Sequence, residues 1–310
     1  MNFVILAIGL ALIVFGADYL INGSTLIAKR FKVSDFVIGM TIVGVGTSMP
    51  EFVVSFVGTL QGSADVAIGN VVGSNIANIL FILGLTAMIH PIAVSKANLR
   101  KDIPLCLGVS LLLTVICLWI TPGVLGRWAG VMLLLIYAWF MYRSFKDNDS
   151  VEEEASEVKE RPMWVAVVMV VGGLLALIFG GRMFVNSATA IAAGLGVSEA
   201  VISITVLAIG TSLPELAASI AAARQGRTQM ALGNVVGSNI ANIALILGLC
   251  ATTSPLSPSG ITAVDYVAMI AAVLLLMLSA FTFRRKMIDR ADGAVMILAY
   301  VAYIIILLNR

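Results

Sequence analysis

The sequence predicts an all-α polytopic membrane protein with ten transmembrane helices in two inverted-topology five-helix repeats. Three observations predict this fold class: the composition, the spacing of the apolar segments and a long internal repeat. Of the 310 residues, 60% are apolar and 12% are charged, whereas soluble domains are about 45–50% apolar and about 25% charged. Such a chain has too little polar surface for a soluble globule, which excludes an ordinary cytosolic enzyme, a disordered chain and a disulfide scaffold.

Ten apolar segments are each about long enough to cross a hydrocarbon core of roughly 30 Å as a helix. Helices are expected because lipid offers no partner to the backbone polar groups. The first segment lacks a basic flank and is too long for a cleaved signal peptide, so it is interpreted as a span. The segments lie near residues 3–21, 36–60, 66–89, 103–120, 124–143, 163–193, 199–223, 230–252, 264–283 and 293–308.

The basic residues of the connections predict the orientation. Ten spans place successive connections on alternate sides, and most of the 19 Lys and Arg residues then fall on one side. The positive-inside rule makes this side cytoplasmic, so both termini are expected to be extracytoplasmic in a plasma (inner) membrane. The net charge of +2 indicates no basic face for nucleic acid.

The chain divides into two similar halves joined by an acidic segment. Residues 1–145 are predicted to form the first five-helix repeat and residues 162–310 the second. Residues 146–161 contain seven acidic residues but lack the spaced ligands and central glycine of an EF-hand loop. We interpret this segment as a solvated cytoplasmic linker, since it is too short to fold as a domain.

The internal repeat has an offset of 164 residues. Residues 41–85 match residues 205–249 at 25 of 45 positions, and the run GNVVGSNIANI occurs unchanged at 69–79 and 233–243. Because each half has an odd number of spans, the second half is expected to enter the membrane in the opposite direction. Inverted repeats of this kind are typical of transporters, whose substrate site lies near the midplane where discontinuous helices meet.

Two matched motifs place acids within the membrane. GTSMPE at 46–51 and GTSLPE at 210–215 each contain a proline, which removes a backbone donor and favours a helix break. Glu51 and Glu215 follow these breaks near mid-span, where a carboxylate is costly and needs a cation partner. We therefore expect a functional role for both acids.

The surrounding residue types favour a hard divalent cation such as Ca²⁺, which takes six to eight oxygen ligands. No Cys or His occurs in the motifs to favour a softer metal. The next spans supply Ser74, Asn78, Ser238 and Asn242 as further oxygen ligands. Two alternatives stay open: the glycines can serve helix packing alone, and Asn75 and Asn239 can bond across helices without touching an ion.

Together these motifs resemble the two α-repeats of the cation/calcium exchanger superfamily, closest to the prokaryotic sodium/calcium exchangers. The resemblance covers nearly the whole chain and implies ten helices, a midplane cluster of one Ca²⁺ and several Na⁺ sites, and first and sixth helices that slide to alternate access. It implies ligand roles for the acids Glu51 and Glu215, the carbonyl donors Gly44, Thr47, Ala208 and Thr211, the hydroxyls of Ser48, Ser74, Ser212 and Ser238, and the amides of Asn78 and Asn242.

One departure bears on the coupling ion. Many sodium/calcium exchangers have Asp where this chain has Asn242, so the site here has at most two carboxylates. The resemblance implies a secondary active antiporter that exchanges Ca²⁺ for Na⁺, with a Ca²⁺/H⁺ or other cation antiporter using the same glutamates as the alternative. An intramembrane hydrolase dyad and a channel are further alternatives from other classes. We expect no enzymatic activity and no cofactor; the expected partners are Ca²⁺, Na⁺ and the lipid bilayer, and a monomer is compatible with the sequence.

Overall fold

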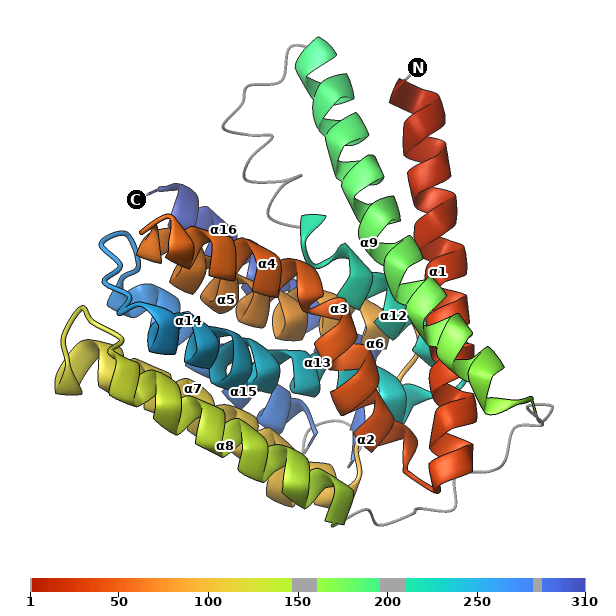
Figure 1. Cartoon of the computed structure of the whole chain (residues 1–310), viewed down its shortest axis with the longest axis horizontal. Helices are drawn as coiled ribbons and strands as arrows, with labels where there is room; N and C mark the ends of the chain where they lie inside the picture. The colour runs from red at the N-terminus through yellow and green to blue at the C-terminus, as the bar shows by residue number, and fades with distance from the viewer. Residues whose placement is uncertain (1, 147–160, 196–209, 281–285, 310) are drawn as a thin grey trace.

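A computed structural model describes residues 2–146, 161–195, 210–280 and 286–309 of the chain. Within these residues the fold consists almost entirely of helices, with one short two-stranded sheet. The helices cross one another at the centre of the molecule, and one long pair stands to the side (Figure 1).

The first half begins with a long helix and continues with helices interrupted by π-helical turns. Its elements are α1 (Asn2–Phe31), α2 (Asp35–Ile38), η1 (Gly39–Val43), α3 (Gly44–Thr47), α4 (Met49–Leu60), α5 (Ala64–Ala77), η2 (Asn78–Leu83), α6 (Gly84–Ile89), β1 (Ile92–Ala93), η3 (Asn98–Asp102), α7 (Ile103–Val115), η4 (Ile116–Ile120) and α8 (Arg127–Lys146).

The second half follows the same order where the structure describes it. Its elements are α9 (Met163–Gly194), α12 (Leu213–Arg224), α13 (Thr228–Ile240), η6 (Ala241–Leu247), α14 (Gly248–Thr253), α15 (Ala263–Ser279), β2 (Met287–Ile288) and α16 (Arg290–Leu308). The bounds of α12, α13 and α14 begin 164 residues after those of α4, α5 and α6, so the sequence repeat is also a repeat of secondary structure.

Seven helical stretches in the described residues are long and apolar enough to cross a membrane. Asp35–Thr47 and Met49–Leu60 together satisfy the same criterion as one broken span, bent by 47°. The apolar helix α15 is shorter, and the predicted span 199–223 lies partly outside the described residues. The chain is therefore an all-helical, multi-pass integral membrane protein; the count of ten spans stays a prediction.

The longest helices, α1 and α9, run side by side and antiparallel (Figure 1). Their close approach depends on glycines, because a Cβ added at Gly16 would lie 2.9 Å from Cβ of Ala176 and 3.0 Å from the carbonyl oxygen of Gly173. Small residues of this kind allow membrane helices to pack backbone to backbone. The pair shares one apolar cluster with α12 and the start of α13, separate from the larger cluster of the remaining helices.

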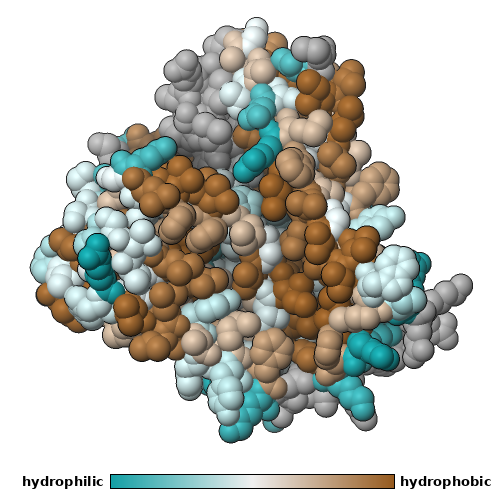
Figure 2. All heavy atoms as spheres, in the orientation of Figure 1, coloured by the Kyte–Doolittle hydropathy of each residue, from teal (hydrophilic) through white to brown (hydrophobic). Residues whose placement is uncertain are grey.

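The surface is apolar over most of the face in view, with hydrophilic residues gathered mainly toward its edges (Figure 2). Large apolar side chains of α1, α8, α9 and α16 point outward, among them Phe15, Leu135, Phe179 and Leu298. Such a continuous apolar surface is unusual for a soluble monomer but is expected where lipid surrounds the helices.

Candidate functional site

The helix break at Ser48 places the first acid. Ser48 has φ −79° and ψ 7°, outside helical values, and separates α3 from α4. Pro50 lies in the first turn of α4, where its missing N–H costs nothing. Glu51 is in the same turn, which is favourable for a carboxylate because the first N–H groups of a helix lack internal partners. Ser212 and Pro214 place Glu215 in the same way at the start of α12.

Each acid is hydrogen-bonded by a serine of the other repeat. Ser48 donates to Oε1 of Glu215 over 3.0 Å, and Ser212 donates to Oε1 of Glu51 over 3.3 Å. Ser74 of α5 also donates to Oε1 of Glu51, over 3.5 Å. Both carboxylates are buried, so the two helix breaks meet at one site inside the protein.

One asparagine of the following helix fixes the backbone at each acid. Asn70 donates to the carbonyl oxygen of Glu51 over 3.1 Å and to Ser55 over 2.9 Å. Asn234 donates to the carbonyl oxygen of Glu215 over 3.1 Å and to Ser219 over 2.8 Å. These bonds tie each acid to the following helix of its own repeat. We did not expect a role for Asn70 and Asn234, although their spacing of four residues from Ser74 and Ser238 puts them on the same helix face.

The carbonyl group of Gly44 lies where α3 packs against α13. Ser238 donates to this oxygen over 3.0 Å, and Thr47 donates to it over 3.3 Å. Thr47 also lies 3.2 Å from Oδ1 of Asn234. Gly44, Thr47 and Ser238 therefore form one polar cluster that links the first repeat to α13 of the second.

Four asparagines connect the two repeats at the point where α5 and α13 become π-helical. Asn75 donates to the carbonyl oxygen of Asn239, and Asn239 donates to that of Asn75, both over 3.1 Å. Asn78 donates to Oδ1 of Asn239 over 3.1 Å, and Asn242 donates to Oδ1 of Asn75 over 3.0 Å. Asn75 and Asn239 therefore bond across the helices, as one of the alternatives from the sequence proposes.

Among the residues that the structure describes, four buried oxygens of this region have no hydrogen-bond partner: Oε2 of Glu51, Oε2 of Glu215, Oδ1 of Asn78 and Oδ1 of Asn242. They come in matched pairs at the repeat offset. Buried polar atoms in proteins almost always have partners, so four orphan acceptors in one region need an explanation. All four are oxygen acceptors, which are the ligands that Na⁺ and Ca²⁺ take rather than those of a soft metal.

The remaining predicted residues are only partly placed. Thr211 lines a cavity of about 190 Å³ together with Pro50, Pro214 and Arg182 of α9. Ala208 lies outside the described residues. Within the described residues no three His, Cys, Asp or Glu side chains gather to hold a metal, so the carboxylates of this region are the two glutamates with neutral oxygens around them.

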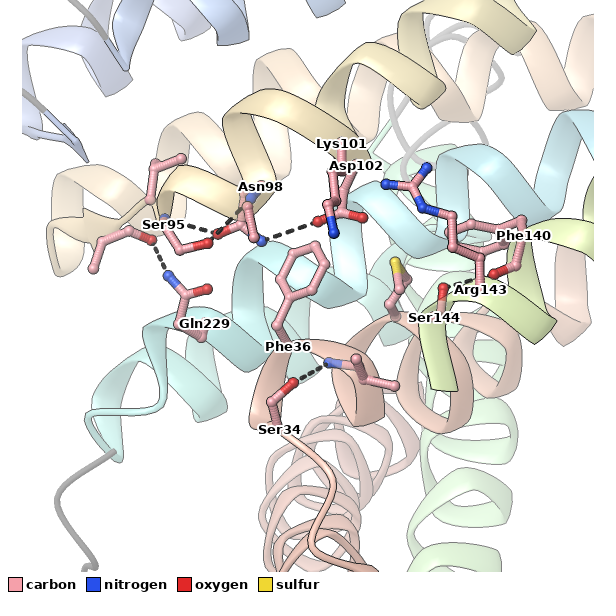
Figure 3. Close-up of a pocket in the computed structure, with 15 residues that line it drawn as sticks. Ser34, Phe36, Ser95, Asn98, Lys101, Asp102, Phe140, Arg143, Ser144 and Gln229 are labelled. Carbon is pink, nitrogen blue, oxygen red and sulfur yellow. Dashed lines mark hydrogen bonds between the residues drawn. The ribbon is translucent and has the colours of Figure 1, made fainter. Parts of the chain in front are cut away.

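A different cavity, of about 340 Å³, lies between α2, η3 and α8 (Figure 3). Its lining includes Lys101, Asp102 and Arg143, and Gln229 donates to the carbonyl oxygen of Ala93 at its edge. None of the predicted ligand residues lines this cavity. It is therefore separate from the glutamate site.

Comparisons with known proteins agree with this architecture. A family model described as sodium/calcium exchanger protein matches residues 1–146 and 165–309. The chain is 36% identical over 304 residues to the putative antiporter CaxA of Alkalimonas amylolytica, covering 96% of this chain and 95% of that protein. It is 33% identical over 344 residues to the sodium/calcium exchanger MaX1 of Methanosarcina acetivorans, covering 99% and 98%.

A solved structure has the same fold. The sodium-calcium exchanger NCX_Mj, from a crystal soaked with zero Na⁺ and Ca²⁺, superimposes with a TM-score of 0.85 at 34% identity, covering 99% of this chain and 98% of that one. The likeness extends over both repeats and the helices around them, because nearly the whole of each chain is covered.

Proposed function

Because the chain belongs to the sodium/calcium exchanger family, we propose that it is a secondary active antiporter that exchanges Ca²⁺ for Na⁺ by alternating access. The four unpartnered oxygens of Glu51, Glu215, Asn78 and Asn242 carry this proposal. A buried acceptor without a donor loses its hydration and gains nothing in return. Bound cations would supply the missing partners.

The proposed ligands are those that the two repeats supply around the glutamates. The acids Glu51 and Glu215 bind Ca²⁺; backbone carbonyls of Gly44, Thr47, Ala208 and Thr211, hydroxyls of Ser48, Ser74, Ser212 and Ser238, and amide oxygens of Asn78 and Asn242 complete the Ca²⁺ and Na⁺ sites. Ser48 already donates to Glu215, and Ser74 and Ser212 donate to Glu51, so each acid is bonded to a serine of the other repeat, which supports a shared site.

The charge of the site gives the exchange its logic. Two carboxylates and neutral oxygens carry a charge of −2, which one Ca²⁺ balances. Na⁺ competes for the same carboxylates, so the two cargoes cannot load together. Exchange of three Na⁺ for one Ca²⁺ would move one net charge, worth about 2.3 kcal/mol per 100 mV. An empty −2 site facing a dry barrier is costly, which prevents the unloaded protein from crossing.

Contacts between connections support ten spans in two inverted repeats. On the side proposed as cytoplasmic, β1 pairs with β2, and Arg227 forms an ion pair with Asp35. On the opposite side Leu125 pairs with Leu256, and Asp65 accepts from Ser259 and Gly260. Every one of these contacts joins connections that the ten-span topology assigns to the same side.

The same topology fixes the proposed domains and orientation. Residues 1–145 and 162–310 are the two repeats, and residues 146–161, mostly outside the described residues, form the cytoplasmic linker. Both termini are extracytoplasmic in the plasma (inner) membrane. Helices α1 and α9 pack along each other through glycines such as Gly16, which supports their movement as a unit across the rest of the bundle.

The test is ⁴⁵Ca²⁺ uptake into proteoliposomes of the purified protein loaded with Na⁺, K⁺ or choline at matched pH. We expect uptake from Na⁺-loaded vesicles only. Uptake should be faster when the vesicle interior is positive, because one Ca²⁺ that enters for three Na⁺ that leave carries one net positive charge outward. Protein-free vesicles and vesicles containing Glu51→Gln are the controls. Equal uptake from all three loadings would contradict Na⁺ coupling.

The second candidate is a Ca²⁺/H⁺ antiporter, in which protons replace Na⁺ on the same glutamates. It is favoured by the amide at position 242, which leaves only two carboxylates to bind cations. No uptake under a Na⁺ gradient, together with uptake under an imposed pH gradient, would establish it.

A further inference from the structure

Asn75 and Asn239 lie one helical turn from proposed ligands but have no orphan atom themselves. Asn78 and Asn242 each use the amide Nδ2 for a hydrogen bond and leave Oδ1 without a partner. We propose that Asn75 and Asn239 are positioning residues that hold the amides of Asn78 and Asn242 with their oxygens toward the transported ions. This inference rests on the proposed function.

The argument begins with the two ends of an amide. An asparagine side chain has one acceptor oxygen and one NH₂ group that donates twice. Only the oxygen can bind a cation, so an asparagine ligand is useful only in one of its two flipped orientations. A free amide has no strong preference between them, and a ligand site must impose one.

The neighbouring asparagine imposes it. Oδ1 of Asn239 accepts from Nδ2 of Asn78 over 3.1 Å. If the Asn78 amide flipped, its oxygen would face the oxygen of Asn239 and its NH₂ group would point where the orphan oxygen now lies. The flip therefore replaces a hydrogen bond with a contact between two acceptor oxygens. Both oxygens would then be buried without a donor, which is unfavourable.

The orienting amide is fixed in turn by the backbone. Nδ2 of Asn239 donates to the carbonyl oxygen of Asn75 over 3.1 Å, so Asn239 cannot flip without losing this bond. The result is a relay: the Asn75 backbone orients Asn239, which orients Asn78. The same relay runs from the Asn239 backbone through Asn75 to Asn242, over 3.1 Å and 3.0 Å.

Each relay crosses between the repeats. The ligand amide of η2 in the first repeat is oriented by α13 of the second, and the ligand amide of η6 by α5 of the first. All four asparagines are buried, with at most 1% of each exposed, so water does not compete for these bonds. Partners of ligands that do not touch the metal typically change affinity by about 10–100-fold when mutated.

A purely structural role predicts a different outcome, and a double-mutant cycle separates the two. The variants are Asn239→Leu, Asn78→Ala and the pair combined. The readouts are the apparent affinity for ⁴⁵Ca²⁺ uptake and the Ca²⁺-induced rise in melting temperature of the solubilised protein. If Asn239 acts through Asn78, the double variant binds Ca²⁺ no more weakly than Asn78→Ala alone, although Asn239→Leu alone weakens binding about 10–100-fold.

The matched control combines Asn239→Leu with Asn242→Ala, whose amide is held by the other relay. Here the two losses should multiply. The mirror cycle, Asn75→Leu with Asn242→Ala, replaces the first if Asn239→Leu does not fold, as judged by melting without Ca²⁺. Multiplying losses in the Asn239–Asn78 cycle, or unchanged Ca²⁺ affinity in a folded Asn239→Leu variant, would overturn the assignment.

The wild-type measurement separates this inference from the function beneath it. Wild-type protein that neither binds nor carries Ca²⁺ would overturn both. Wild-type protein that exchanges Ca²⁺, together with losses that multiply in both cycles, would leave the exchanger standing and remove only the positioning role.

Discussion

The two acids of the site stand in equivalent sequence positions but in different surroundings. Glu51 accepts hydrogen bonds from Ser212 and Ser74, whereas the described donor to Glu215 is Ser48. The counterpart of Ser74 is Ser238, which donates to the carbonyl oxygen of Gly44 instead. Ser74 therefore bonds within its own repeat and Ser238 bonds to the other one, so these two identical residues have different partners.

Under the proposed function, the difference determines which existing hydrogen bonds a bound cation would have to compete with. At Glu51 the hydroxyls already point at the carboxylate, and a cation can bind beside them. At Gly44 the carbonyl oxygen already accepts hydrogen bonds from Ser238 and Thr47, so a cation that uses this oxygen would compete with both hydroxyls.

The largest expected effect tests whether the two acids are equal despite this asymmetry. Glu51→Gln and Glu215→Gln should each abolish ⁴⁵Ca²⁺ exchange, a loss greater than the roughly 10–100-fold typical of residues behind the metal ligands. Each removes a charge of −1 from a site that must balance Ca²⁺. Asp18→Asn, which removes an exposed acid from α1, is the control and should retain exchange. Full exchange by either glutamine variant would show that the acids are not an equivalent pair.

The second largest expected effect should distinguish Glu51 from Glu215. Ser48→Ala removes the only described serine that donates to Glu215, whereas Ser212→Ala leaves Glu51 with Ser74. A hydrogen bond to a charged group contributes about 1.5–3 kcal/mol. We therefore expect Ser48→Ala to weaken apparent Ca²⁺ affinity by about tenfold or more and Ser212→Ala by clearly less. Equal losses, measured by uptake at varied Ca²⁺, would mean that the asymmetry is not retained in the working protein.

The sequence identifies the polar residues that the structure gathers in this region, but it does not identify their hydrogen-bond partners. The acids, hydroxyls and amides are visible in the repeated motifs because charged and polar residues are rare in membrane helices. The exchange of partners between repeats, such as Ser48 with Glu215, is invisible because the two motifs are 164 residues apart and identical where they matter. Asn70 and Asn234 were missed because a backbone carbonyl, their acceptor, leaves no trace in the sequence.

The sequence likewise predicts some features of the fold and misses others. Apolar length predicts the helices because lipid forces each span to satisfy its own backbone. It does not predict the π-helical turns η2 and η6, at which Asn78 and Asn242 lie. Nor does it predict that α2 and η1 pack on the backbone of α13, since the sequence GNVVGSNIANI is the same in α5 and α13.

This packing gives a third prediction, on stability. A Cβ at Gly237 would lie 2.5 Å from Cα of Met40, whereas a Cβ at Gly73, its counterpart, meets no described atom within 4 Å. Overpacking costs about 1–3 kcal/mol. Gly237→Ala should therefore lower the melting temperature, and Gly73→Ala should change it little. Similar melting of both variants would show that the two faces are packed alike in the protein in its membrane.

The smallest expected effect concerns the ion pair beside that packing. Arg227 and Asp35 lie 2.7 Å apart, nitrogen to oxygen, and tie the start of α13 to the start of α2. The corresponding positions of the other repeat cannot form this ion pair, because Ser63 stands at the position that corresponds to Arg227. The two side chains are only 11% and 9% exposed, so salt screens this pair less than a surface pair, and removing one partner alone would leave a buried unpaired charge.

Losing the pair should favour separation of α2 from α13. Asp35→Asn combined with Arg227→Gln leaves no unpaired charge, so it should lower the melting temperature by less than Gly237→Ala while it speeds amide hydrogen exchange in residues 35–43. Ser63→Arg is the matched test: it supplies a base in the first repeat at the position that corresponds to Arg227, and Glu199 of the second repeat stands at the position that corresponds to Asp35. If removing the ion pair left exchange in 35–43 unchanged, the contact between α2 and α13 would depend on the glycine packing alone.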